Sequence, residues 1–340
     1  MNSELLIAGP CAAESERQLL DTAAQLQEEV RAHGWQLALY RAGVWKPRSR
    51  PDSFEGMGEA ALPWLAEVQR QFGFPVCVEV MTPHQVELCR KHGISAFWVG
   101  ARTGVNPATV QEIANAVKGD PVTVLVKNPM VPDFKLWAGN VERFLHAGVT
   151  KVMAVHRGFA DSTENVYRNA PRWEIPIELK VQFPDLPILC DPSHICGHTR
   201  WIAQIAQVAL AYGFDGLMME CHAHPEQALS DAEQQLTPRQ WAELVETLSF
   251  KTNVPNRDLV KQRALLENVD TQLSELLSMR FHIVDEIARI KRDNNLPVVQ
   301  PQQWAQVRKR YLKADQDIQY QEFIEQFLEV LHINSIKRQQ

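Results

Sequence analysis

The feature that most constrains this chain is a regular alternation of short apolar segments with longer amphipathic ones. Eight segments have the β-branched, apolar composition of buried strands: Leu5–Ala8, Gln36–Tyr40, Val76–Val80, Phe97–Gly100, Val122–Val126, Lys151–Val155, Ile188–Cys190 and Gly216–Met219. Helical periodicity marks segments between or after them: Glu16–His33, Leu62–Phe72, Pro83–His92, Pro107–Val117, Trp137–Ala147, His198–Tyr212 and Pro238–Leu248. Eight strands alternating with helices in about 250 residues predict an α/β fold, a (β/α)8 TIM barrel.

A doubly wound open sheet is the competing interpretation, because periodicity alone does not reveal whether a sheet closes. The dinucleotide-binding version of that fold carries a Gly-x-Gly-x-x-Gly turn after its first strand. The sequence after Ala8 has no such turn, which weakens this alternative.

The pattern changes after residue 249. Residues 250–257 are expected to link the barrel domain, residues 1–249, to a small all-α three-helix domain, residues 258–340. Three helical patterns follow the linker, at Arg257–Lys291, Gln302–Lys313 and Ile318–Lys337. A helical domain this thin buries little apolar surface alone, so we expect a homodimer through it, or a larger assembly.

The net charge, the apolar runs and the cysteines limit which partners and which location are expected for the chain. The formal net charge of −6 argues against nucleic acid or an anionic membrane as a partner, so an anionic substrate needs a local cationic pocket. No apolar run reaches the length of a membrane span, and the first ten residues lack the basic start of a signal peptide. Six scattered cysteines without a Cys-x-x-Cys pair favour reduced thiols and a cytoplasmic protein.

Barrel enzymes carry their chemistry at the carboxyl ends of the strands, and here those ends are rich in cations. The basic residues at or after the predicted strands are Arg41, Lys46, Arg48, Arg102, Lys127 and Arg157. Six cations facing one cavity repel each other unless anions neutralise them. Phosphates and a carboxylate suit such a pocket, because arginine offers them paired hydrogen bonds.

A second set of side chains at the same ends offers metal ligands: Cys11, His194, Glu220 and Asp231. Thiolate, imidazole and carboxylate together suit a borderline divalent ion such as manganese, iron, cobalt or zinc. Each residue alone has an ordinary explanation: a lone cysteine is usually a small buried hydrophobe, and a lone arginine is usually a solvated charge. Polar residues after so many successive strands favour one shared site.

Several motifs in these positions carry a resemblance to a known family. They are Gly-Pro-Cys-Ala-Ala-Glu-Ser from Gly9, Lys-Pro-Arg-Ser from Lys46, Gly-Ala-Arg from Gly100, Asp-Pro-Ser-His from Asp191, and the stretch from Glu220 to Asp231. Over residues 4 to about 249 the chain resembles 3-deoxy-D-arabino-heptulosonate 7-phosphate (DAHP) synthase. The resemblance is to the shorter subtype, which is close to 3-deoxy-octulosonate 8-phosphate synthase.

The resemblance implies roles for the residues that match. Cys11, His194, Glu220 and Asp231 would bind the metal. Arg41, Arg102, Lys127 and Arg157 would hold phosphoenolpyruvate, with Asp191 in the substrate site. Lys46, Arg48 and Ser49 would meet erythrose 4-phosphate. Lys46 and Lys127 would be catalytic, and Lys127 or a metal-linked water would move protons.

Two details of the Lys-Pro-Arg-Ser run bear on the substrate. The octulosonate synthase carries an Ala-Asn-Arg-Ser run there, so Lys46 favours the seven-carbon product. The family's usual threonine is Ser49 here. The eight-carbon synthase, which takes arabinose 5-phosphate, is the alternative.

The long helical pattern of the second domain places two cations on an apolar stripe. Arg280 and Lys291 project within about 20° of one another, which is costly unless an anion meets them. Arg263 points about 100° away from Arg280 and does not easily reach the same pocket, but a symmetry-related chain could supply it. A helical oligomerisation arm with cations extended along its apolar surface is the other interpretation.

Residues 258–340 also resemble the all-helical chorismate mutase family, with matching offsets at Arg263, Asp270, Arg280, Lys291, Pro297, Ser335 and Gln339. The resemblance implies that Arg280 and a partner chain's Arg263 clamp the carboxylates of chorismate. Lys291 and Gln339 would face its ether oxygen, and Ser335 would contact it. In the family's Asp-x-x-Arg-Glu turn, Gln303 and Trp304 replace the last two residues. An allosteric sensor of prephenate or chorismate is therefore the alternative to a mutase.

Overall fold

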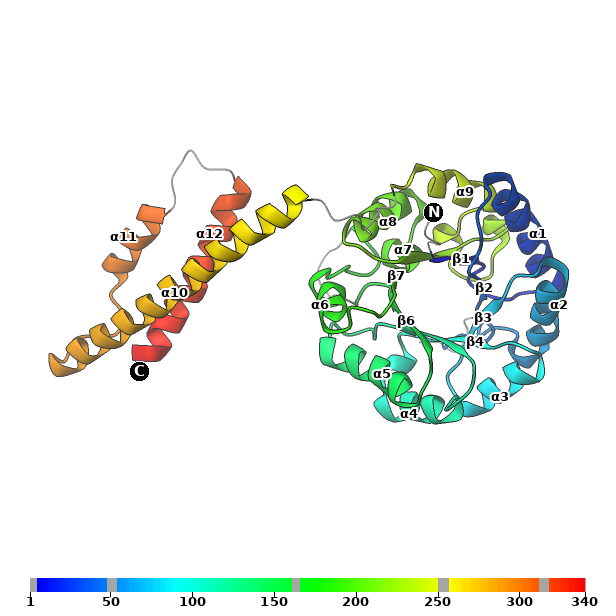
Figure 1. Cartoon of the computed structure of the whole chain (residues 1–340), viewed down its shortest axis with the longest axis horizontal. Coiled ribbons are helices and arrows are strands. Elements are labelled where there is room, and N and C mark those ends of the chain that lie inside the picture. Colours follow the sequence, from blue (N-terminus) through cyan, green and yellow to red (C-terminus); the bar gives the residue numbers. More distant parts are fainter. Residues whose placement is uncertain (1–4, 48–53, 161–165, 250–256, 312–317, 340) are drawn as a thin grey trace. The chain divides into compact units, whose positions relative to one another are not determined.

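The computed structural model describes residues 5–47, 54–160, 166–249, 257–311 and 318–339. The chain divides into two compact units, Met1–Thr252 and Asn253–Gln340 (Figure 1). The predicted linker falls almost entirely outside the described residues. Each unit is described by itself.

The first unit is a closed barrel of eight parallel strands in sequence order. The strands are β1 Leu5–Gly9, β2 Leu39–Ala42, β3 Val76–Glu79, β4 Ala96–Val99, β5 Thr123–Lys127, β6 Lys151–His156, β7 Ile188–Cys190 and β8 Gly216–Glu220. The pairing of β1 with β8, from Leu5 opposite Gly216 to Gly9 opposite Glu220, closes the sheet. The predicted barrel is confirmed, and the open sheet is excluded.

Helices surround this barrel (Figure 1). They are α1 Glu16–His33, α2 Leu62–Phe72, α3 Pro83–Lys91, α4 Pro107–Ala116, α5 Phe134–His146, α6 Glu174–Gln182, α7 Pro192–Cys196, α8 Ile202–Ala211 and α9 Pro238–Thr247. Short 3-10 turns are η1 Gly58–Ala61, η2 Thr103–Val105, η3 Thr199–Trp201, η4 Pro225–Gln227 and η5 Ala232–Gln234. Apolar side chains fill both the space between sheet and helices and the inside of the barrel, where Trp98 is the largest.

Two local features differ from the pattern-based expectation. Strand β2 begins at Leu39 and continues through Arg41, whereas the predicted strand was Gln36–Tyr40. Arg41 is buried in the strand because Glu220 neutralises it, and hydrophobicity alone does not anticipate a buried cation. Helix α6 was not among the predicted helical segments; its Pro176 lies in the first turn, where a backbone N–H has no helical partner to lose.

The described residues of the second unit form three helices, α10 Arg257–Asp293, α11 Pro301–Tyr311 and α12 Ile318–Gln339, with a non-helical turn over residues 294–300 between the first two. Helices α10 and α12 pack along one another, burying Val284 and Ala288 against Ile324 and Leu328. Many large apolar side chains stay exposed on α10, among them Leu266, Leu273, Leu276, Met279, Ile283 and Ile287. The described helices of both units include none long and apolar enough to cross a membrane.

Candidate active site

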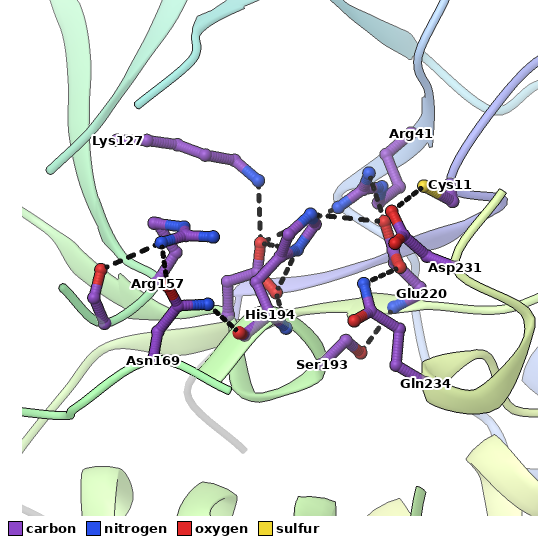
Figure 2. A network of polar contacts seen from close by, with 12 residues as sticks. Cys11, Arg41, Lys127, Arg157, Asn169, Ser193, His194, Glu220, Asp231 and Gln234 are labelled. Atoms are coloured by element: carbon purple, nitrogen blue, oxygen red, sulfur yellow. Dashed lines mark hydrogen bonds and ion pairs between the residues drawn. The ribbon is translucent and has the colours of Figure 1, made fainter. Parts of the chain in front are cut away.

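The four predicted metal ligands lie together with Arg41, Lys127 and Arg157 at the carboxyl ends of the strands (Figure 2). Arg41 lies in β2, Lys127 ends β5 and Glu220 ends β8. Cys11, Lys46, Arg157 and Asp191 lie in segments that follow strands, His194 lies in α7, and Asp231 immediately precedes η5. Strand order therefore brings together residues more than 200 positions apart in the sequence, such as Cys11 and Asp231.

Three of the four predicted metal ligands form one compact group. Ligand atoms of Cys11, Glu220 and Asp231 all lie within 4.8 Å of one another. The Cys11 Sγ lies 3.2 Å from Asp231 Oδ2. His194 is not a member of this group, but its Nε2 lies 3.6 Å from Glu220 Oε1. The fourth predicted ligand therefore borders the group through Glu220.

Asp191 orients the His194 ring. The Asp191 Oδ1 lies 3.0 Å from His194 Nδ1 and accepts the backbone N–H of His194 at 3.1 Å. Burial lowers the pKa of His194, although Asp191 and Glu220 oppose that shift. A neutral ring that donates its Nδ1 proton to Asp191 leaves the Nε2 lone pair on the side of Glu220. This is the usual arrangement of a metal-binding histidine and its supporting carboxylate.

The chemistry of the donors fits a divalent ion. Burial, followed by the charge of Glu220, raises the pKa of the Cys11 thiol to about 12, so a positive charge is needed to hold it as a thiolate. Lys46 supplies one, with its Nζ donating to Cys11 Sγ at 2.7 Å. Burial would also raise the pKa of Glu220, but positive charge on His194, when its ring is protonated, and on Arg41 and Lys46 outweighs burial and lowers that pKa. The group thus combines an anionic carboxylate with a thiol that a cation would ionise.

A buried cationic cluster borders the ligand group. Arg41 Nη2 donates to Glu220 Oε1 at 3.0 Å, and Lys127 Nζ donates to Asp191 Oδ2 at 2.7 Å. Both cations lie over the Trp98 ring, at 5.0 Å and 5.5 Å from its centroid. The Nε and Nη1 atoms of Arg41 are buried without a hydrogen-bond acceptor. Buried donors in folded proteins rarely lack an acceptor, so these two nitrogen atoms are available to an anion.

Arg157 is a further buried cation near this cluster, and the charges of two more arginines act on it. Burial, with Arg168 and Arg102 adding repulsion, lowers the pKa of Arg157 to about 10, although Asp191 opposes the shift. Arg157 Nη1 donates to Asn169 Oδ1 at 2.8 Å. Arg102 is exposed. Arg48 and Ser49 lie outside the described residues.

Several polar residues that the sequence patterns did not single out support the ligands. Gln234 Nε2 donates to Glu220 Oε2 at 2.6 Å, and the Ser193 hydroxyl accepts the backbone N–H of Glu220 at 2.9 Å. Gln235 accepts the backbone N–H of Cys11 at 2.9 Å. Arg168 Nη1 donates to Asp231 Oδ1 at 2.8 Å. Only Ser193 lay in a motif, so the others carried no signal in the sequence.

The helical unit brings together four of its five predicted site residues. Arg280 Nη1 donates to the Ser335 hydroxyl at 2.9 Å, and Lys291 Nζ donates to Gln339 Oε1 at 3.0 Å. Helix α12 thus faces both cations of the α10 stripe. Arg263 lies in α10, but its side chain is outside the described part. Nearby, Trp304 stacks on His332 with 3.9 Å between ring centroids, and Gln303 is exposed.

Comparison with family models gives two matches along the chain. Residues 2–254 match the DAHP synthetase I family, and residues 262–340 match chorismate mutase type II. The break between the two matches falls where the chain divides into its two compact units.

Individual relatives resemble the barrel region. Phospho-2-dehydro-3-deoxyheptonate aldolase of Thermotoga maritima is 29% identical over 243 residues, covering 72% of this chain and 68% of the relative. The 2-dehydro-3-deoxyphosphooctonate aldolase of Alkalilimnicola ehrlichii is 30% identical over 260 residues, covering 72% of this chain and 88% of the relative. A crystal structure of the Thermotoga maritima DAHP synthase superposes with a TM-score of 0.61 at 28% identity, covering 72% of this chain and 68% of that one.

Proposed function

Because the chain belongs to the DAHP synthetase I family over residues 2–254 and carries a chorismate mutase type II domain over residues 262–340, we propose that it is bifunctional. The barrel condenses phosphoenolpyruvate with erythrose 4-phosphate to give DAHP and inorganic phosphate. The helical domain converts chorismate to prephenate. The two domains are those of a transferase and an isomerase.

The observation that carries the synthase proposal is the buried cationic cluster beside the ligand group. Arg41, Lys127 and Arg157 are buried, and Arg41 has donors without acceptors. These side chains would neutralise the phosphate and carboxylate of phosphoenolpyruvate, with Arg102 at the rim. Lys46, Arg48 and Ser49 would hold erythrose 4-phosphate. Binding both substrates in one buried pocket supplies much of the rate enhancement through proximity and orientation.

Cys11, His194, Glu220 and Asp231 would hold a manganese, iron, cobalt or zinc ion. When bound, the ion supplies Lewis-acid polarisation of the aldehyde oxygen. The enol carbon of phosphoenolpyruvate then forms the new C–C bond, water adds to its central carbon, and phosphate leaves. Burial lowers the pKa of Lys127 despite the opposing charge of Asp191. Lys127 is therefore the side chain best suited to move a proton.

The synthase proposal is tested on intact protein by measuring phosphoenolpyruvate consumption. Removing divalent ions with a chelator should abolish turnover, and adding back Mn²⁺ or Co²⁺ should restore it. Full activity of a Cys11→Ala variant without added metal would contradict the proposed ligand set.

The eight-carbon synthase is the second candidate, because an octonate aldolase is 30% identical to this chain. Parallel assays with erythrose 4-phosphate and arabinose 5-phosphate separate the two. We expect turnover with the four-carbon sugar phosphate; a preference for arabinose 5-phosphate would select the alternative.

The Arg280–Ser335 and Lys291–Gln339 pairs support the mutase proposal. Arg280 would clamp a carboxylate of chorismate with Arg263 of a partner chain, while Lys291 and Gln339 would stabilise the ether oxygen in the transition state. The exposed apolar side chains of α10 support a homodimer through this domain. Because Gln303 and Trp304 replace the family's arginine and glutamate, an allosteric sensor without turnover is the alternative.

Prephenate formation by the full chain tests this part. We expect turnover that Arg280→Ala removes. Normal synthase activity that prephenate or chorismate inhibits, with no mutase turnover, would instead identify a sensor.

A further inference from the structure

Residues 168–170, between β6 and α6, form hydrogen bonds to α7, to Phe159 and to Arg157 beside the barrel site. The backbone N–H groups of Arg168 and Asn169 donate to the carbonyls of Cys196 and Ile195 in α7, at 3.3 Å and 3.0 Å. Phe159 and Ala170 pair as an antiparallel bridge just beyond. The Asn169 side chain accepts from Arg157 and donates to the His194 carbonyl at 2.7 Å. Figure 2 shows this bridge from Arg157 to His194.

The anchored segment directs Arg168 towards the metal ligands. Its Nη1 donates to Asp231 Oδ1 at 2.8 Å and to Gln234 Oε1 at 2.9 Å. Gln234 in turn donates to Glu220 Oε2. Arg168 thus contacts one grouped ligand directly and a second through Gln234.

Local packing fixes the arginine stem. A Cβ added at Gly197 would lie 2.6 Å from Arg168 Cβ, so glycine is what lets the stem lie against this turn. Asp231 has a φ of +51°, a conformation that residues other than glycine rarely adopt. Held in this conformation, Asp231 offers Oδ1 to Arg168 and keeps Oδ2 beside Cys11 Sγ.

We propose that Arg168 is a positioning residue for the metal centre, which sets ion affinity by orienting Asp231 and the Gln234–Glu220 pair. The inference rests on the ion site in the proposed function. Removing Arg168 would change ion affinity in two opposite directions, through the loss of its charge and through the loss of its orienting contacts. A nearby positive charge opposes cation binding, so its loss alone would tighten binding. Loss of orientation would weaken binding, typically by 10- to 100-fold for partners of metal ligands.

The test compares ion affinity in full-length metal-free protein carrying Arg168→Gln, Arg168→Lys or Arg200→Gln. Arg200 is the matched control, because it is an exposed arginine three residues after Gly197 that stacks on Trp201 at 4.8 Å. Affinity for Co²⁺ is measured by calorimetry and by the thiolate–cobalt absorption that Cys11 would produce. We expect about 10-fold or weaker binding for Arg168→Gln, a smaller loss for Arg168→Lys and no change for Arg200→Gln.

Unchanged or tighter binding in Arg168→Gln overturns the proposal, and so does an equal loss in Arg200→Gln. Should Arg168→Gln fail to fold, Arg168→Lys decides, because lysine keeps the charge but lacks the guanidinium geometry; wild-type affinity in that variant overturns the proposal. Binding is measured without turnover. Wild-type protein that binds Co²⁺ through Cys11 but makes no DAHP would therefore defeat the proposed synthase and leave this inference standing.

Discussion

Asp191 is a buried carboxylate that offsets the positive charges of Lys127 and Arg41. Its neutralisation is therefore the most informative single change. Its carboxylate is fully buried and lies 2.7 Å from Lys127 Nζ and 3.8 Å from Arg41 Nη1. Among the described residues, Asp191→Asn leaves the buried Glu220 and the partly buried Glu79 to offset the charges of Arg41, Lys127 and Arg157. The variant keeps the approximate shape of the side chain, removes its charge and replaces the oxygen that accepts from Lys127 with an NH2 group, which cannot accept.

The expected cost follows from the burial of the partners. Removing one partner of a buried ion pair typically costs about 3–5 kcal/mol, because a charge stays buried without compensation. The amide oxygen can still accept from the His194 backbone, so we expect about 3 kcal/mol. For a domain of this size about 1 kcal/mol lowers the unfolding temperature by roughly 2–4 °C. Asp191→Asn should therefore melt about 6–12 °C below the wild type.

Thermal unfolding of the intact protein, followed by tryptophan fluorescence, measures this shift. The control is Glu243→Gln, which removes one partner of an ion pair with Arg239 whose side chains are 82% and 61% exposed; such a pair contributes about 0–1 kcal/mol. Burial would raise the pKa of Asp191, but His194 and Lys127 outweigh it and hold that pKa well below 3.8. The difference in unfolding temperature between Asp191→Asn and the wild type should therefore persist from neutral pH down to about pH 4. Below about pH 4 it should decrease as Asp191 becomes protonated. An Asp191→Asn protein as stable as the wild type would refute the charge-balance argument.

Three further outcomes are expected. Cys11→Ser should lose the thiolate–cobalt absorption and bind Co²⁺ more weakly, as measured by calorimetry, because it removes the soft ligand; an unchanged spectrum would exclude Cys11 as a ligand. Arg280→Ala should lower the kcat/KM of prephenate formation by about 100-fold or more, whereas synthase turnover in the same sample should be unchanged. Burial, followed by the charge of Arg157, lowers the pKa of His156 to about 3, so its protonation in the unfolded chain should reduce stability as pH falls below about 6.5, by about 1.4 kcal/mol per pH unit. Urea unfolding of His156→Gln between about pH 7 and pH 5 should show a shallower pH dependence than the wild type, and an identical slope would count against a buried neutral histidine.

The fold was predictable because each strand and most helices carry their own periodicity. Helix α1 has the predicted bounds, Glu16–His33, since its amphipathic pattern is bounded by a capping serine and a terminal glycine. The predicted strand ended at Tyr40, whereas β2 continues to Ala42. The apolar pattern placed the end too early because the next residue, Arg41, is charged but buried. Closure of the sheet is a property of three-dimensional pairing, and counting eight strands was its only sign in the sequence.

The site was predictable only where a motif marked it. Strand ends and motifs identified Cys11, Glu220 and Asp231, which form one group. Arg168, Asn169 and Gln234 act through contacts between separate loops, and nothing in their local sequence indicates a partner 63 residues away, as for Arg168 and Asp231. The role of every predicted site residue stays a prediction, and the side chains of Arg48, Ser49 and Arg263 lie outside the described part of the chain.

The cations of the two units differ in burial, and their hydrogen-bond partners differ accordingly. In the barrel, Arg41 and Lys127 are inaccessible to water, so ionised partners, Glu220 and Asp191, must offset their charge before a substrate arrives. In the helical unit, Arg280 and Lys291 are only partly buried and bond to neutral partners, Ser335 and Gln339. Water compensates these cations when no ligand is bound, so no carboxylate is needed to hold them. If the proposed anionic substrates bind at these sites, the substrate in the barrel would have to redistribute existing ion pairs. The substrate in the helical unit would instead have to displace water from two cations. Burial of Arg41 and Lys127 is thus one reason for the acidic residues beside them, in addition to the proposed metal-binding role of Glu220 and the contact of Asp191 with His194.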